Sequence, residues 1–214
     1  MNSYYNDTLY PLQNKVLHTI AAQSTPFYLT GGTALSRGYF GYRYSDDLDL
    51  FLNSDPSFLK YTDSIITALQ QNFTLNMAHR SDSFISLKIN EILKLEFIND
   101  VTFHSGQLEK KPFFPKVDNV LNILSNKLSA LLSRDEPKDV VDIWVIAKNI
   151  KVNWPTIFQD ANSKAVGIFP PDIAKRLLEF PAELLDLIKW TPNHKPDLAS
   201  FKKDLAHICD AILA

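Results

Sequence analysis

The chain has 214 residues, 45% of them hydrophobic and 12% aromatic, which is enough apolar side chain to bury a substantial core and argues against disorder. A formal net charge of −2 gives no general attraction for polyanions, so any nucleic-acid contact must come from a local basic patch. Cys209 is the single cysteine, which excludes an internal disulfide and a thiolate metal cluster.

The N-terminal residues and the apolar runs of the sequence bear on where the protein is expected to act. The first residues lack the layout of a signal peptide, and no apolar run is long enough to span a membrane. Together with the single cysteine, these features predict a cytoplasmic protein that makes no membrane contact.

The first predicted elements are a helix, a strand and a glycine turn. Apolar residues recur with helical spacing over residues 7–23, which predicts an amphipathic helix packed on a sheet. Residues 27–29 have the composition of a buried strand. A Gly-Gly-Thr turn follows at residues 31–33, and a further helix is expected from there to about Tyr39.

The second predicted strand carries two carboxylates. Residues 47–52 alternate, so that Asp47 and Asp49 project from one face while the leucines between them face a core. Two like charges held this close repel each other unless a cation or proton intervenes. Mg²⁺ is commonly bound through one or two carboxylates plus phosphate oxygens, and a glycine turn before a helix suits a phosphate. We therefore expect phosphate and metal to meet at one edge of the sheet.

A helix and three short strands come next. Residues 56–71 have helical spacing and begin with a proline, which suits a first helical turn. Residues 73–79, 83–89 and 91–99 are β-rich and are separated by turn residues, which predicts a meander that extends the sheet.

The last strand of this meander contains a charged residue, Glu96. It lies on the face opposite to Leu95 and Phe97. Such a glutamate is either a solvated surface residue or a functional carboxylate, and Asp100 at the end of the strand is the competing candidate.

The pattern becomes purely helical near residue 117. Residues 101–116 are rich in turn residues, and we interpret them as the link between a domain at 1–116 and a helical domain at 117–214. A helix is predicted at 118–133, and later helices are expected at 154–165, 172–189 and 197–213. None of these later helices carries a catalytic motif.

Charged residues interrupt the apolar stripes of two helices in the second half. Lys127 lies on the stripe of residues 118–133, where an ammonium needs an anionic partner. In the next helix Asp139 and Asp142 fall among apolar residues at helical spacing. Lys127 therefore belongs to a functional cleft, snorkels at the edge of the stripe, or forms a buried ion pair with Asp142.

Strand, Gly-Gly-Thr turn, helix and Arg-x-Ser-x-Asp-x-Asp follow one another within residues 27–52. This combination resembles the signature of the DNA polymerase β nucleotidyltransferase superfamily, and the form GGTALS…RYSDDLDLF resembles the AbiEii/AbiGii abortive-infection toxin family. The run KLSALLSRDEPKDVVDIWVI resembles the second signature of that family. The resemblance implies an α+β fold, with a polymerase-β-like mixed sheet flanked by helices and a C-terminal helical bundle after it.

The resemblance also implies a role for each matching residue. The metal ligands would be Asp47, Asp49 and Glu96, because such folds usually add a third carboxylate from a neighbouring strand. Gly31, Gly32 and Thr33 would bind the β- and γ-phosphates, and Lys127 would bind the triphosphate. Arg43, Ser45 and Lys138 would make other substrate contacts. Asp139 would lie near the acceptor as a positioning residue or base. Lys127 and Asp139 would thus join the acidic residues in catalysis.

Two assignments stay open at this point. Arg43 either contacts phosphate or pins the loop before the acids. Asp142 either supports the site or serves only as structural glue between helices.

The implied activity is transfer of NMP from an NTP to an acceptor, dependent on Mg²⁺ or Mn²⁺ and releasing pyrophosphate. The acceptor would be tRNA, another RNA or a protein. The resemblance further implies the toxin of a toxin–antitoxin or abortive-infection system, with a cognate antitoxin protein as partner. The alternatives are a non-catalytic nucleotide-binding regulatory module and a metal-dependent phosphohydrolase. A P-loop NTPase is disfavoured, because no Gly-Lys-Ser/Thr follows the glycine turn.

Overall fold

The computed structural model describes residues 2–214, which form two compact units. The first unit contains the chain up to Gly38 together with Tyr44–Asn119, and the second contains Tyr39–Arg43 together with Val120–Ala214. The chain therefore enters the second unit for one short segment, returns to the first, and leaves it for good after Asn119. None of the helices within residues 2–214 is long and apolar enough to cross a membrane.

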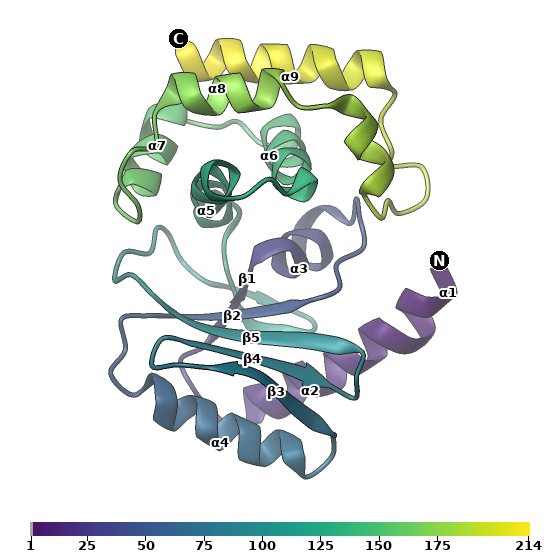
Figure 1. Ribbon diagram of the computed structural model, residues 1–214, viewed down its shortest axis with the longest axis vertical. Coiled ribbons are helices and arrows are strands. Elements are labelled where there is room, and N and C mark those ends of the chain that lie inside the picture. The colour runs from purple at the N-terminus through teal and green to yellow at the C-terminus, as the bar shows by residue number, and fades with distance from the viewer. Residues whose placement is uncertain (1) are drawn as a thin grey trace. The chain divides into compact units, whose positions relative to one another are not determined.

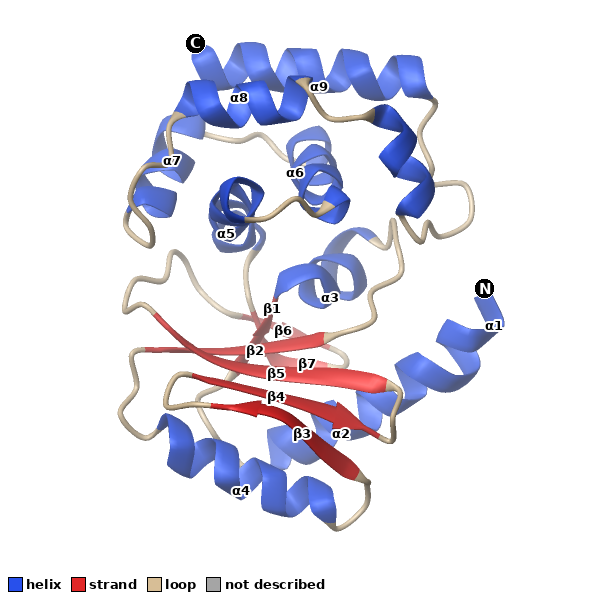
Figure 2. Ribbon diagram, viewed as in Figure 1, coloured by secondary structure: helices blue, strands red, loops and turns tan. Residues whose placement is uncertain are grey.

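The first unit is built on a mixed sheet, drawn in red in Figure 2. Over residues 2–214 it has seven strands in the order β3-β4-β5-β2-β1-β7-β6. The strands are β1 (Tyr28–Thr30), β2 (Leu48–Asn53), β3 (Leu75–Arg80), β4 (Phe84–Ile89), β5 (Leu93–Asp100), β6 (Glu109–Lys111) and β7 (Phe114–Val117). The pairs β2–β5 and β1–β7 are parallel, and the other neighbouring pairs are antiparallel.

The predicted meander is confirmed, because β3, β4 and β5 are successive neighbours in the sheet. The interpretation of residues 101–116 as a link without strands is wrong in part, since β6 and β7 lie there. These strands are short and contain lysine and proline, which weakens their β signal. They form nevertheless because β7 pairs with β1 at Leu29 and Val117 and because Phe114 and Val117 are buried.

Helices cover one face of the sheet. The segments α1 (Asn2–Tyr4), the π-helical η1 (Tyr5–Leu9) and α2 (Tyr10–Ala22) follow one another without a break, and α2 packs beside α4 (Phe58–Gln70), as Figure 1 shows. Phe27 lies 5.9 Å from the Phe58 ring of α4 and 5.0 Å from the Phe97 ring of β5, so an aromatic cluster joins helix and sheet. The predicted alternation of β2 is confirmed, because its leucines are buried in this core.

The first turn after β1 lies on the other face of the sheet. The helix α3 (Gly31–Leu35) begins directly at the glycine pair, two residues earlier than predicted, and contacts both β1 and β2. It continues into the π-helical segment η2 (Ser36–Phe40).

The second unit is helical. Its elements are α5 (Val120–Ser133), α6 (Pro137–Asn149), α7 (Trp154–Asn162), α8 (Pro170–Leu178), the 3-10 segment η3 (Ala182–Leu187) and α9 (Leu198–Leu213). The helix α5 packs against α6, α7 and α8, and α9 packs against α6, α7 and α8. The helix expected over residues 172–189 is interrupted at Pro181, since α8 ends before this proline and η3 starts after it.

A buried ion network joins α5, α6 and the segment Tyr39–Arg43 of the second unit. Asp142 is fully buried and accepts hydrogen bonds from Nε of Arg43 at 2.8 Å and from Nη2 at 2.9 Å. The Tyr42 hydroxyl donates to the same carboxylate. Nζ of Lys127 lies 2.5 Å from Oδ2 of Asp142, so the predicted ion pair between these two residues is confirmed.

Asp139 extends this network. It accepts from Nζ of Lys127 at 2.7 Å and from two nitrogens of Arg134 at 2.7 and 3.0 Å. Burial alone would raise the pKa values of Asp139 and Asp142, but the adjacent cationic groups outweigh it and hold both pKa values below their usual range. Both aspartates therefore remain charged inside the helical unit.

Arg43 fixes its own segment within the second unit. It forms an antiparallel bridge with Trp190, and the backbone N–H of Thr191 donates to the Tyr42 carbonyl at 3.1 Å. The Thr191 hydroxyl donates to the Gly41 carbonyl at 2.6 Å. These contacts hold residues 41–43 within the second unit, and the choice between phosphate binding and pinning of the loop for Arg43 stays a prediction.

Replacing Arg43 by methionine should destabilise the protein strongly. The Asp142 carboxylate would stay buried with less opposing charge, and breaking such a pair typically costs about 3–5 kcal/mol. The control is Lys195→Met, which removes an exposed pair with Asp186 and should change stability by less than about 1 kcal/mol. Urea unfolding followed by fluorescence measures both variants, and equal, small losses would contradict a buried pair.

Candidate functional site

Polar and acidic residues of neighbouring strands, which we call the acidic row, lie at paired positions across the sheet. Glu96 of β5 lies opposite Asp49 of β2, and Asp49 lies opposite Thr30 of β1. The row ends at Asp118, just after β7, where the fully buried carboxylate accepts from the Thr30 hydroxyl at 2.6 Å. His104 lies 3.0 Å from the other oxygen of Asp118.

Gly31 brings the backbone turn directly against Asp49. Its φ of +68° is a conformation that side chains rarely adopt, and a β-carbon there would lie 2.4 Å from Oδ2 of Asp49. No other residue could hold this approach without moving the carboxylate. The glycine turn and one of the two predicted acids therefore meet, and the turn forms the first part of α3, where backbone N–H groups have no partner within the helix.

Thr33 and Ser45, which we predicted to bind substrate, contact each other. The buried Thr33 hydroxyl lies 2.9 Å from Oγ of Ser45 and also donates to the Asp47 carbonyl. These contacts tie the glycine turn to the loop before β2. A direct role for either hydroxyl in substrate binding stays a prediction.

Gln13 of α2 holds the same loop from the helical layer. Its side chain is fully buried, and Nε2 donates to the carbonyls of Ser45 at 3.1 Å and Asp46 at 3.0 Å. Its Oε1 accepts from Arg37 at 2.8 Å. Both amide hydrogens and the amide oxygen are therefore used, and the residue before Asp47 is fixed in place.

Two tyrosines, Tyr5 and Tyr10, also contact this loop, and together with Gln13 they form what we call the clamp. Tyr5 donates to Oδ1 of Asp46 at 2.7 Å and stacks on Tyr44 with ring centroids 4.0 Å apart. Burial, followed by the neighbouring Asp46, raises the pKa of Tyr5, so its hydroxyl stays protonated and able to donate. The hydroxyl of Tyr10 accepts from the Ser45 backbone N–H at 3.3 Å.

Sequence reasoning missed this clamp, although one signal was present. Gln13 falls at helical spacing between Leu9 and Val16, so it is a polar residue on the buried stripe of its helix. A buried glutamine needs hydrogen-bond partners, but its sequence neighbours do not reveal that these partners lie in the loop before β2.

Lys94 forms an ion pair with Glu96, the third predicted metal ligand. Nζ of Lys94 lies 2.8 Å from Oε1 of Glu96. Burial alone would lower the pKa of Lys94, but the hydrogen bond to Glu96 and the charges of Glu96, Asp47 and Asp49 outweigh it and raise the pKa. Glu96 is therefore ion-paired with Lys94, and the competing candidate Asp100 lies opposite Asn53 further along β2.

The donor chemistry of Asp47 and Asp49 suits a hard divalent ion. Among residues 2–214, no group of three or more His, Cys, Asp or Glu side chains is positioned to hold a metal ion. Mg²⁺ is usually held by one or two carboxylates together with substrate phosphates and water, not by a cage made entirely of protein. Two aspartates near a glycine turn at the start of a helix fit that arrangement, and Glu96 as a further ligand stays a prediction.

The remaining predicted site residues lie in the second unit. Lys127, Asp139 and Arg43 belong to its buried ion network, and Lys138 is a partly exposed residue 3.9 Å from Glu136. Their contacts with nucleotide or acceptor stay predictions.

Two solved structures resemble this chain over most of its length. MenT4, a nucleotidyltransferase toxin from Mycobacterium tuberculosis H37Rv, has a TM-score of 0.60 and 14% identity, covering 96% of this chain and 82% of that chain. JHP933 from Helicobacter pylori has a TM-score of 0.57 and 21% identity, covering 94% of this chain and 90% of that chain. At such identities the likeness shows the fold, and the predicted α+β, polymerase-β-like class is confirmed.

The family follows from the sequence match. No protein with a curated description matches the chain. The family model described as "Nucleotidyl transferase AbiEii toxin, Type IV TA system" matches residues 16–208, which is most of the chain. A match over this much of the chain shows the family, and the chain belongs to the AbiEii nucleotidyl transferase toxins.

Proposed function

We propose that this nucleotidyltransferase moves an NMP unit from an NTP to an acceptor in a reaction that depends on Mg²⁺ or Mn²⁺. The observation that carries the proposal is the contact between the Asp49 carboxylate and the Gly31 turn. It supports a site in which a phosphate binds the turn while the metal that neutralises it binds the acids.

The reaction would form a bond between the acceptor oxygen and the α-phosphorus and break the bond from that phosphorus to the oxygen of pyrophosphate. A divalent ion, when bound, would offset the triphosphate charge and make the acceptor hydroxyl easier to deprotonate. The N–H groups of Gly31 and Gly32 would hold the β- and γ-phosphates, and Asp47 and Asp49 would supply metal-binding oxygens. The chain's part is therefore mainly positioning and electrostatic stabilisation.

Glu96 is proposed as a third metal-binding carboxylate. Its register opposite Asp49 supports this role. Lys94 balances part of the negative charge on this face, which reduces the repulsion between carboxylates.

The acceptor and the partner are proposed from chemistry and from the family. RNA such as tRNA, or a protein, would offer the nucleophilic hydroxyl. The family description names a type IV toxin–antitoxin system, which supports a separately encoded antitoxin as partner.

A non-catalytic nucleotide-binding module is the second candidate. Two observations favour it. Among residues 2–214 no three His, Cys, Asp or Glu side chains are positioned to hold a metal ion, and Glu96 is paired with Lys94. The module would bind NTP without releasing pyrophosphate, so calorimetric binding combined with a turnover assay separates the two candidates.

The direct test is transfer by an Asp49→Asn variant. Purified protein is incubated with α-labelled NTPs, Mg²⁺ or Mn²⁺, and pools of RNA or protein, and label in the acceptor is counted. The variant should lose on the order of 10²–10³-fold in rate, because a charge that stabilises the transition state is removed. Asp63→Asn is the control, since Asp63 is exposed and pairs with Arg80 at the surface. Wild-type protein that labels nothing would sink the enzyme proposal, and an Asp49→Asn variant as active as the control would sink the site.

A second prediction compares two glycines with positive φ. Gly31→Ala and Gly41→Ala both place a side chain in a left-handed conformation and should each lose about 1–2 kcal/mol of stability. Only Gly31→Ala also pushes the Asp49 carboxylate, since nothing lies within 4 Å of a β-carbon at residue 41. Displacing a reacting group by about 1 Å can cost about 10²-fold in rate. Equal transfer rates for the two variants would show that this contact has no catalytic importance.

A third prediction concerns the clamp on the loop. Gln13→Glu keeps an oxygen for Arg37 but replaces the donor to the Ser45 and Asp46 carbonyls with a second oxygen. Transfer should fall about tenfold and need more Mg²⁺ for half-maximal rate, because buried acceptors lose their donor. Asn14→Asp is the matched control, as Asn14 is exposed and also contacts Arg37. A Gln13→Glu protein with the metal dependence of the control would refute a positioning role.

A further inference from the structure

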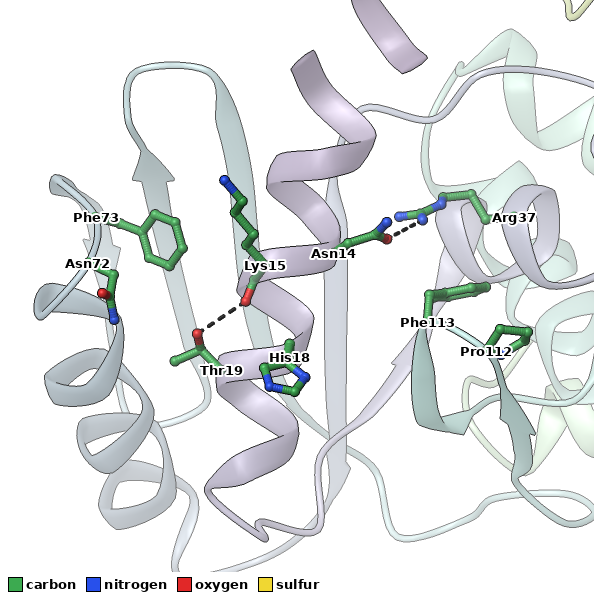
Figure 3. Close-up of a pocket in the computed structure, with 9 residues that line it drawn as sticks. All are labelled: Asn14, Lys15, His18, Thr19, Arg37, Asn72, Phe73, Pro112 and Phe113. Carbon is green, nitrogen blue, oxygen red and sulfur yellow. Dashed lines mark hydrogen bonds between the residues drawn. The ribbon is translucent and has the colours of Figure 1, made fainter. Parts of the chain in front are cut away.

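A groove of about 940 Å³ runs over the exposed side of α2, away from the acidic row. Figure 3 shows α2 along its floor, Phe73 on one flank, and Phe113 and Pro112 of the β6–β7 connection on the other. All of its lining residues belong to the first unit.

The charge of the groove is opposite to that of the chain. Lys15 and Arg37 supply two positive charges, and His18 supplies a third when it is protonated. No aspartate or glutamate lines the groove within the described residues, although the whole chain carries a formal charge of −2. It is therefore a local basic patch of the kind that the composition requires for any contact with a polyanion.

Arg37 is the unusual member of this patch. Its guanidinium lies between the rings of Tyr10, at 4.6 Å, and Phe113, at 4.7 Å. Its hydrogen-bond partners among the described residues are the neutral amides of Gln13 and Asn14, and it makes no salt bridge there. Figure 3 shows the side chain directed toward Asn14 at the edge of the groove.

A half-buried guanidinium with no carboxylate beside it loses part of its hydration without gaining an opposing charge. Burial lowers the pKa of Arg37, in contrast to Arg43, whose burial is balanced by Asp142. An anion placed at the groove would restore the missing charge balance and use the N–H groups that the two amides leave over. The groove therefore favours an anionic occupant.

We propose that this groove binds the phosphodiester backbone of single-stranded RNA. Phosphates would pair with Lys15 and Arg37, and bases would stack against Phe73 and Phe113, which combines a positive track with aromatic platforms. An acidic peptide would satisfy the cations but would not use the aromatic flanks in this way. The proposal goes beyond nucleotide transfer, because this binding requires neither NTP nor metal.

Hydrogen bonds link the groove to the loop that precedes Asp47. Arg37 contacts Gln13, and Gln13 in turn holds the Ser45 and Asp46 carbonyls. An RNA strand whose phosphates displace Arg37 would therefore also affect Gln13, which fixes the position preceding Asp47.

The test is fluorescence anisotropy of a labelled single-stranded oligouridylate, titrated with protein in EDTA and without NTP. The double variant Lys15→Ala/His18→Ala should bind about tenfold more weakly, and the dependence of log affinity on log salt should become shallower by about 0.7 per lost phosphate contact. Both residues are exposed and lie outside the proposed catalytic machinery. Circular dichroism checks that the variant is folded.

The matched control is Lys88→Ala/His79→Ala, which removes the same residue types from exposed positions on β4 and β3. It should leave RNA affinity unchanged, and a loss there with full affinity in the groove variant would overturn the proposal. Wild-type protein that does not bind the RNA would also overturn it.

Two further outcomes separate the groove from its rivals. An oligoglutamate peptide that displaces the RNA at equal concentration, and loses affinity in the groove variant, would assign the groove to acidic peptides instead. RNA binding by a wild-type protein that transfers no label would refute the transferase proposal and leave the groove standing, and transfer without groove binding would do the reverse.

Discussion

The site depends on one close approach, that of the Asp49 carboxylate to the backbone of Gly31. A β-strand can present two acids on one face, but like charges there repel each other unless a cation is supplied. The glycine turn lies beside those acids at the start of a helix, which supports our proposal that a metal and a phosphate bind there together. Only a residue without a β-carbon allows the turn to come this near.

The loop before the acids is held by groups distant in sequence. The side chains of Gln13, Tyr5 and Thr33 each donate a hydrogen bond to a backbone or side-chain atom of residues 45–47. On the preceding side, Arg43 is anchored by Asp142 within the helical unit. The contacts of Gln13, Tyr5 and Thr33 support our proposal that this loop positions two carboxylates for chemistry, since small displacements of reacting groups are costly in rate.

Sequence patterns predicted the elements whose signals are local. The alternation at β2, the three-stranded meander and the helical spacing of α2, α4 and α5 are all confirmed. Strands β6 and β7 were missed because their stability comes from the pairing of β7 with β1 and of β6 with β7, and not from their own composition. The pair of Lys127 and Asp142 was among the predicted alternatives, because charges on apolar stripes demand partners. The roles of Gln13 and Arg37 could not be predicted, since their partners are set by tertiary packing.

The central claim is that acids and glycine turn hold one metal-bound triphosphate. Anomalous diffraction from a crystal grown with Mn²⁺ and a non-hydrolysable NTP analogue tests it most directly. The account predicts a manganese peak within about 2.2 Å of a carboxylate oxygen of Asp49, with a phosphate on the N–H groups of Gly31 and Gly32. Manganese and analogue bound elsewhere, with both aspartates free of metal, would contradict it.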